Sequence, residues 1–207
     1  MGINAQRSLK GKSIKYIHCF SKERMKKRSI FKAGMVCNLV LIFSIFFGAL
    51  SAYSQIPEYE LKSVLMLKMI NFIEWPESYE NEKDEFVISV LGQNPFGKYL
   101  DHTFENIKIK DKEVIIRYIK DHNDIAGSDV LFIARSERSN IDDILMTVNG
   151  KPILTIGDTI GFGEKGVHIN FFVEKSRIRF YINESSAGQN GLEIDYHLRN
   201  VAKRIFR

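Results

Sequence analysis

The sequence predicts an α/β fold: a single domain with a mostly parallel central sheet flanked by helices, a C-terminal β-hairpin and a terminal helix. Short apolar strands alternate with helical segments over residues 86–157, as in a parallel sheet covered on both faces. The pattern then changes to two β-rich segments, 167–174 and 177–183, which Lys175 and Ser176 join as an antiparallel hairpin. No linker or repeat divides residues 55–207, so one domain is expected.

The first elements follow from periodicity and from Pro76. Apolar residues at helical spacing, with charged residues between them, predict an amphipathic helix from Ile56 to Trp75, which Pro76 ends. Residues 86–91 form a continuous apolar run of strand length, closed by a loop over 92–95. Helical spacing then resumes from Phe96 to Phe104.

The middle of the chain repeats this alternation. Strands are predicted at residues 113–119, 129–134 and 153–157, with a helix over 141–148 between the last two. A turn-rich loop follows over 158–166.

The end of the chain, from Ser185 to Arg207, has apolar residues at helical spacing and is interrupted near Gly188 to Gly191. These residues predict the terminal helix.

Residues 1–54 have the composition of an export leader, and residues 55–207 form the working domain. A basic cluster from Met25, an apolar run from Met35 to Leu50 and small residues up to Ser54 are the layout of a secretory signal peptide over 25–54. Cleavage after Ser54 would leave Gln55 as the mature N-terminus.

Two points about this leader stay open. A cut near Ala49 and Ser51 competes with the cut after Ser54, and Met25 is the expected true start of translation. The alternative is an N-terminal membrane anchor with a cytoplasmic tail, although the apolar run is short of the about 20 residues that a spanning helix needs.

The charge is unevenly distributed. Of the 30 basic and 25 acidic residues, 10 basic and one acidic lie in residues 1–54, which leaves 20 basic against 24 acidic residues in the domain. A nucleic-acid partner is therefore not expected. Both cysteines, Cys19 and Cys37, also lie in the leader, so the domain has no disulfide and no thiol chemistry.

No pattern in the domain marks an enzyme, a metal site or a cofactor site. Its histidines are scattered without metal-ligand spacing, and its serines lack the G-x-S-x-G elbow of a nucleophile. The acidic pair Asp142-Asp143 is interpreted as a solvated helix face. Gly161 to Gly166 match G-x-G-x-x-G, but a strand follows where a nucleotide loop needs a helix.

Polar residues gather where the predicted strands end. Ligands of open α/β sheets bind at the carboxyl ends of the strands. The candidates there for binding a ligand or a partner are Gln93, Asn94, Arg135, Ser136, Glu137, Gly157 and Asp158. Loop and helix capping is an alternative role for the same residues.

Five segments, in this order, resemble the YfiR-like family. The resemblance covers about residues 58–206 and rests on INFIEWP (70–76), FVISVLGQNPFGKYL (86–100), DVLFIARSE (129–137), PILTIGDTIGFGEKGVHINFFVE (152–174) and RIRFYIN (177–183). It implies a periplasmic α/β protein, dimeric in some relatives, that binds the periplasmic part of a membrane diguanylate cyclase and holds it inactive. Cyclic-di-GMP and biofilm formation would then be limited.

This chain departs from the family at two points. Many relatives carry a cysteine just before the third segment, where this chain has Gly127-Ser128-Asp129, so a disulfide switch is not supported. Some relatives are fused to sensor kinases, whereas here a kinase would be a separate partner.

A second hypothesis uses the same strand ends. The chain would be a periplasmic small-molecule-binding protein, acting as the input of a sensor kinase, or a weak hydrolase. Arg135 would clamp an anion and Asp158 would supply a polar contact.

Overall fold

The computed structural model describes residues 56–77 and 84–207, and residues Ile56–Arg207 form one compact unit. The predicted leader, its two cysteines and the predicted cut between Ser54 and Gln55 lie outside the described residues. No helix among the residues that are described has the length and apolar character to cross a membrane.

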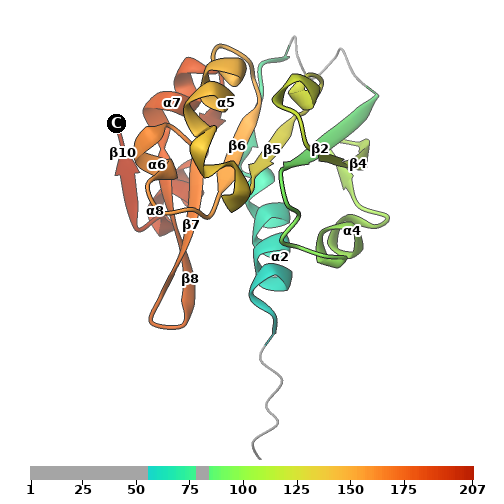
Figure 1. The fold of residues 1–207 in the computed structure, drawn as a ribbon, viewed down its shortest axis with the longest axis horizontal. Helices are drawn as coiled ribbons and strands as arrows, with labels where there is room; N and C mark the ends of the chain where they lie inside the picture. Colours follow the sequence, from blue (N-terminus) through green and yellow to red (C-terminus); the bar gives the residue numbers. More distant parts are fainter. Residues whose placement is uncertain (1–55, 78–83) are drawn as a thin grey trace, which may run out of the picture. The chain divides into compact units, whose positions relative to one another are not determined.

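The chain alternates between strands and short helices (Figure 1). The α-helices are α2 (Glu58–Ile70), α4 (Tyr99–Phe104), α5 (Ile141–Val148), α6 (Phe162–Lys165), α7 (Glu184–Gln189) and α8 (Tyr196–Val201), with 3-10 helices η1 (His122–Ile125) and η2 (Arg135–Ser139). The strands are β1 (Ile73–Glu74), β2 (Glu85–Leu91), β3 (Lys108–Ile109), β4 (Lys112–Ile119), β5 (Val130–Ile133), β6 (Leu154–Gly157), β7 (Ile169–Glu174), β8 (Arg177–Asn183), β9 (Glu193–Ile194) and β10 (Arg204–Phe206).

The main sheet has eight strands in the order β10-β8-β7-β6-β5-β2-β4-β3. Strands β4, β2, β5, β6 and β7 run parallel, while β7 and β8 form the antiparallel hairpin. The predicted α/β class with a mostly parallel sheet is confirmed. Strand β2 lies between β4, the next parallel strand along the chain, and β5, the parallel strand after that, so the order reverses between β2 and β5. Such reversal points are where open α/β sheets bind ligands.

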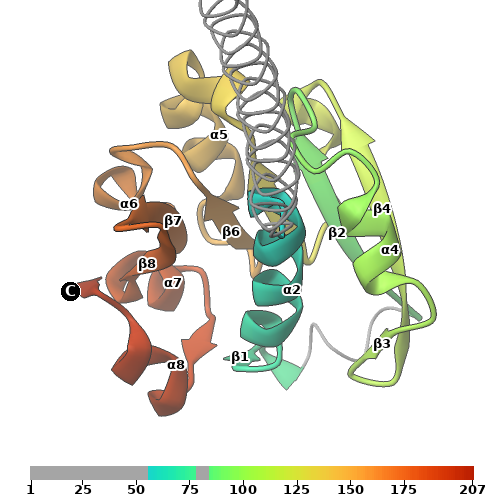
Figure 2. The same ribbon diagram turned by 90° about the horizontal axis from the view of Figure 1, so that it is seen from below.

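Both faces of the sheet are covered, as the apolar strands require. In β5, Val130 and Phe132 point into the core beneath α2, whereas Leu131 and Ile133 point into the core beneath α5. Helix α2 lies on one face of the sheet, with β2 on one side of the helix and β7 and β8 on the other (Figures 1 and 2).

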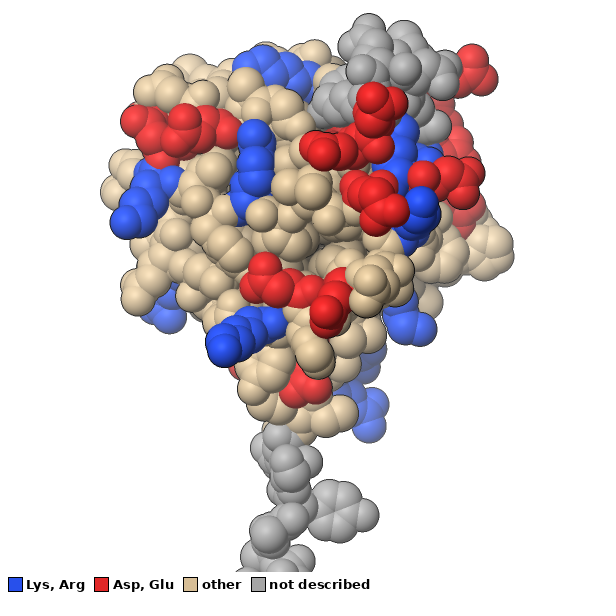
Figure 3. Space-filling view, turned by 90° about the vertical axis from the view of Figure 1, so that its right-hand side faces the viewer, with Lys and Arg blue, Asp and Glu red and all other residues tan. Residues whose placement is uncertain are grey.

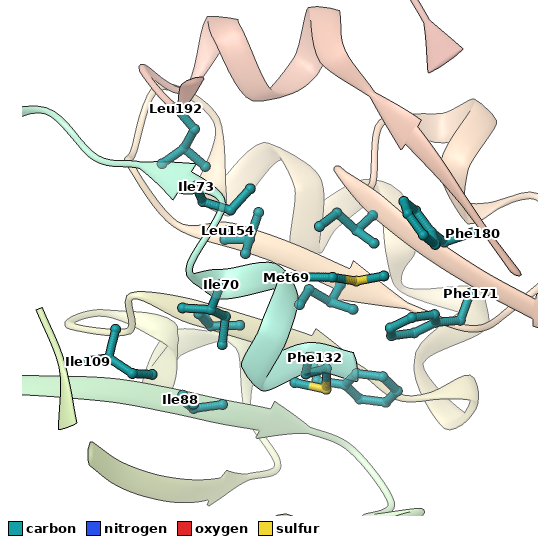
Figure 4. Packing of buried hydrophobic residues seen from close by; sticks show 14 of the residues in the cluster. Met69, Ile70, Ile73, Ile88, Ile109, Phe132, Leu154, Phe171, Phe180 and Leu192 are labelled. Carbon is teal, nitrogen blue, oxygen red and sulfur yellow. The ribbon is translucent and has the colours of Figure 1, made fainter. Parts of the chain in front are cut away.

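Figure 4 shows the core beneath α2. Met69 and Ile70 of the helix lie among Ile88, Phe132 and other apolar side chains that come from several strands. The alternation of buried faces fixes the register of each strand, since a slip of one residue would exchange the two cores.

The first helix is shorter than predicted, because tertiary pairing replaces its last turn. Helix α2 ends at Ile70, and Ile73 pairs with Ile194 in the two-stranded β1–β9 sheet. Trp75 therefore lies outside the helix and is 6% exposed, and its indole N–H donates to the Pro152 carbonyl at 3.0 Å. The Trp75 side chain packs in the core beneath α2.

The helical prediction for the end of the chain extends too far. Helix α7 ends at Gln189 and α8 ends at Val201, and β9 lies between them. Gly191, with φ of 75°, makes the turn that the sequence placed near Gly188 to Gly191. The last element is a strand, since Ile205 of β10 pairs with Ile182 of β8.

A buried histidine connects β6, β7 and α7. His168 is 1% exposed; its Nδ1 accepts from the Thr155 amide at 3.1 Å, and its own amide donates to Thr155 Oγ1 at 2.9 Å. Asn190 Nδ2 lies 3.3 Å from the other ring nitrogen. Burial lowers the pKa of His168 to about 4. The ring is therefore neutral at pH 7 and serves as a structural bridge.

Two serine hydroxyls meet between β2 and the start of β5. Ser128 Oγ lies 2.7 Å from Ser89 Oγ, and both side chains are fully buried. Arg117 donates to both, at 2.9 Å to Ser128 and 3.2 Å to Ser89. Hydrogen bonds thus tie β2, β4 and the start of β5 together here.

Candidate functional site

The loops after β2 and β5 meet at the point where the strand order reverses. The amide of Gln93 donates to Ser136 Oγ at 2.9 Å, and Ser136 Oγ donates to Glu137 Oε1 at 3.0 Å. Gly92, with φ of 93°, permits this contact, because a Cβ there would collide with the side chains of Ser136 and Glu137. Three of the predicted site residues, Gln93, Ser136 and Glu137, are therefore brought together.

Asp158 follows β6 and belongs to a second group, which we call the α2–β6 cluster: Glu58, Tyr59, Lys62 and Asp158. Asp158 Oδ2 accepts from Lys62 Nζ at 2.6 Å and from the Tyr59 hydroxyl at 2.8 Å. Lys62 Nζ also lies 2.6 Å from Glu58 Oε1. The side chains of Lys62 and Asp158 are only 3% and 6% exposed, so this is a buried ion pair.

Tyr59 acts in this cluster as a hydrogen-bond donor. Burial, then the hydrogen bond to Asp158 and the charge of Asp158, raise the pKa of the Tyr59 phenol well above its usual value. The positive charge of Arg135 has a smaller, opposite effect on this pKa. Arg135 begins η2, directly before Ser136 and Glu137, and its side chain is exposed.

Asn94 has a local structural role. Its Oδ1 accepts from the Phe96 amide at 2.8 Å, and its Nδ2 donates to the Gly97 carbonyl at 3.1 Å. This turn seats the fully buried Phe96 ring edge-on against Phe132, with the ring centroids 4.7 Å apart. Asn94 therefore fits the alternative role of a loop-capping residue.

Sequence reasoning missed Lys62 as a member of the site, because it grouped this residue with the polar face of the first helix. The structure buries Lys62 on the same face as Met66 and Met69. A lysine at that spacing on the apolar stripe, four residues after Glu58, was the available signal. Tyr59 and the buried Asn170 were also missed, and nothing in their spacing marked them.

Gly157 is the last residue of β6, and this end of the strand lies against α6. A Cβ at Gly157 would lie 2.9 Å from Phe162 Cδ2 and 3.4 Å from Asn170 Oδ1. Gly157 thus allows Phe162, which is 1% exposed, to pack directly on the strand.

We expect Gly157→Ala to lower the free energy of unfolding by about 1–3 kcal/mol, because Phe162 must move out of its packed position. The matched control is Gly188→Ala in α7, where an added Cβ meets nothing within 4 Å. That control should leave stability unchanged or raise it by up to about 1 kcal/mol. Urea denaturation measures both, and equal stabilities of the two variants would contradict the packing argument.

No group of three or more His, Cys, Asp or Glu side chains that could hold a metal ion occurs within residues 56–77 and 84–207. The Gly161 to Gly166 segment, predicted as a loop, contains the four-residue helix α6. Strand β7 follows at Ile169, as the sequence predicted.

The fold and the site define a class: α/β domains with an open, mostly parallel sheet and polar loops at its carboxyl edge. Within that class, the model of the YfiR/HmsC-like family matches residues 59–203, so the chain belongs to the YfiR/HmsC-like family. The resemblance stated from the sequence is thereby confirmed. No curated protein matches the chain.

One solved structure supports the fold, and the fold alone. A conserved domain protein from Vibrio cholerae O1 biovar El Tor aligns with a TM-score of 0.51 at 14% identity, covering 73% of this chain and 61% of that one. The ABC domain from Streptococcus pneumoniae, solved with L-Trp, has a TM-score of 0.49 at 10% identity, covering 70% of this chain and 60% of that one. The aligned region thus spans about 60% of the length of each.

Proposed function

We propose that this protein is an exported periplasmic regulator that binds the periplasmic region of an inner-membrane diguanylate cyclase and represses it. Cyclic-di-GMP and biofilm formation would fall as a result. Membership of the YfiR/HmsC-like family over residues 59–203 carries this proposal. The signal-peptide pattern of residues 25–54 supports export, with cleavage proposed after Ser54.

The charge of the domain suits a protein partner. Residues 55–207 have 20 basic and 24 acidic residues. On the face shown in Figure 3, Lys and Arg side chains are interspersed with Asp and Glu side chains. A large region of one sign, which nucleic acid would require, is not present on that face.

Repression sets a thermodynamic requirement. A regulator that bound the active and inactive states of its partner equally would shift nothing. Moving a partner from 1% to 99% inactive requires about 10⁴-fold tighter binding to the inactive state. The contact surface must therefore distinguish two shapes of the partner.

We propose the strand-end loops as part of this contact surface. Gln93, Ser136 and Glu137 are joined by hydrogen bonds and therefore present one preorganised surface, and Arg135 is exposed beside them. Preorganisation lowers the entropic cost of binding. Asp158 contributes indirectly, since its carboxylate is bound by Lys62 and Tyr59.

The test is deletion of the gene in its own host, with measurement of cellular cyclic-di-GMP and surface attachment. We expect both to rise on deletion and to return to normal when the full chain is restored. A chain lacking residues 25–54 should fail to restore them, because it is not exported. Arg135→Ala should restore them only in part, whereas Lys165→Ala, an exposed control, should restore them fully. Unchanged cyclic-di-GMP after deletion would exclude a cyclase as the partner.

A sensor kinase is the alternative partner. It would leave cyclic-di-GMP unchanged and alter the phosphorylation of a response regulator instead. We propose no catalytic residue for this protein, and a homodimer is an expectation that analytical ultracentrifugation of the exported chain would test.

A further inference from the structure

We propose that two copies of this chain join edge to edge through β4, with the two β4 strands antiparallel about a two-fold axis at Ile116. Strand β4 lies near one margin of the main sheet, with α4 beside it (Figures 1 and 2). The proposal gives the expected homodimer a defined contact, and it is independent of the proposed repressor function.

The outer edge of β4 is covered only at its start. On its inner side, β4 pairs with β2 along residues 113–119. On its outer side, β3 is the last strand of the sheet and pairs only with Lys112 and Glu113. The outer edge from Val114 to Ile119 therefore has no strand partner among residues 56–77 and 84–207.

The backbone of this edge offers hydrogen bonds at alternate residues. The Ile119 carbonyl accepts from the Gly92 amide at 3.0 Å, so the polar backbone groups of Ile119 face inward, toward β2. Because the direction of these groups alternates along a strand, those of Val114, Ile116 and Tyr118 face outward. Outward-facing groups on an edge strand are a template for pairing with a strand of another chain.

This edge lacks the features with which sheet edges usually prevent such pairing. Residues 114–119 contain no proline, and their one-to-one pairing with β2 has no bulge. The charged residue in this segment is Arg117, and its guanidinium donates to Ser89 and Ser128 of the same chain. Ile115, in the middle of the segment, is 37% exposed. The edge is therefore apolar and unprotected.

A groove beside this edge has room for a second strand. The groove has a volume of about 690 Å³, and it is lined by Glu113 to Ile116 of β4 together with residues of α4 and of the segment that follows α4. Neighbouring strands of a sheet lie about 4.8 Å apart. A strand that paired with the outer edge of β4 would therefore enter this groove.

The sequence of β4 favours a second copy as the occupant, in one register. With Ile116 opposite Ile116, Val114 lies opposite Tyr118 of the second copy, and aromatic and β-branched pairs of this kind stabilise sheets. A shift by two residues in one direction places Arg117 opposite Arg117, and like charges directly opposite are destabilising. A shift in the other direction brings Tyr118 of the second copy beside Lys112, where β3 already pairs.

Sedimentation velocity of the exported chain over a range of concentrations tests the contact. We expect a monomer–dimer equilibrium for the wild type. Ile115→Lys should weaken dimerisation at least tenfold, because its ammonium group would lie opposite Arg117 of the second copy. Val173→Lys adds the same charge at a 52% exposed position of β7 and is the control expected to dimerise like the wild type. A wild type that is monomeric at high micromolar concentration, or equal dimerisation of Ile115→Lys and the wild type, would overturn the proposal.

Disulfide trapping tests the register. Residues 55–207 contain no cysteine, so Ile116→Cys supplies the single thiol of the exported chain. Directly paired residues of antiparallel strands have Cα atoms about 5.5 Å apart, which a disulfide can span. Oxidation of Ile116→Cys with diamide should therefore give a covalent dimer on a denaturing gel. Ile115→Cys lies opposite Arg117 instead and is the control expected to remain monomeric there. Equal cross-linking of the two variants, or none of Ile116→Cys, would refute pairing about Ile116.

Discussion

Replacing Lys62 with methionine is expected to lower the free energy of unfolding by about 3 kcal/mol. The substitution leaves the Asp158 carboxylate, which is 6% exposed, with only the Tyr59 hydroxyl as a partner. Removing one member of a buried ion pair costs about 3–5 kcal/mol, because the remaining charge stays desolvated. For a domain of this size the melting temperature should fall by roughly 6–12 °C.

A double-mutant cycle distinguishes this effect from lost packing. Lys62→Met combined with Asp158→Leu should cost less than the sum of the two single substitutions, since no unpaired charge remains. Lys165→Met breaks an exposed pair with Asp142, whose side chain is 70% exposed, and should cost less than about 1 kcal/mol. Additive single and double effects would contradict the buried-pair explanation.

The domain should also lose about 3 kcal/mol of stability between pH 6.5 and pH 4 because of His168. Its pKa is lowered from 6.5 to about 4 in the folded state. Below pH 6.5 the unfolded chain binds a proton that the folded chain does not, because burial disfavours the charged form of the ring. This part of the stability is complete above pH 6.5 and is lost as the pH falls, by about 1.4 kcal/mol per unit.

Urea denaturation across this pH range measures the slope. Carboxylates titrate near the lower end, so the slope of the wild type is compared with that of His168→Asn, which should be shallower. His102→Asn, at a side chain that is 87% exposed, is the matched control and should retain the wild-type slope. If His168→Asn and the wild type had the same slope, the histidine would not be the cause.

The fold could be predicted from the sequence wherever the local pattern and the tertiary structure agree. The apolar runs of β2 and β5 and the periodicity of α5 predicted those elements to within a residue or two at each end. Prediction failed where pairing with distant residues decided the structure. For the residues of β1 and β10 the sequence predicted helix. A short stretch of sequence does not show that these residues pair with the distant strands β9 and β8.

The site could be predicted in part for the same reason. Parallel strands end at one edge, so Gln93 and Ser136 could be expected to meet. The pairing of Lys62 with Asp158 could not be predicted, because Asp158 lies 96 residues further along the chain. Asn170 lies within the apolar run of β7. Only the structure shows that its side-chain Oδ1 is buried near Gly157 and accepts no hydrogen bond from the described residues.

The pairing of β1 with β9 also sets when the protein can finish folding. Ile73 pairs with Ile194, which follows much later in the chain, so the β1–β9 sheet cannot form from neighbouring residues alone. Because these two residues lie far apart in the chain, their pairing closes a long loop, and contacts of this kind form late in folding.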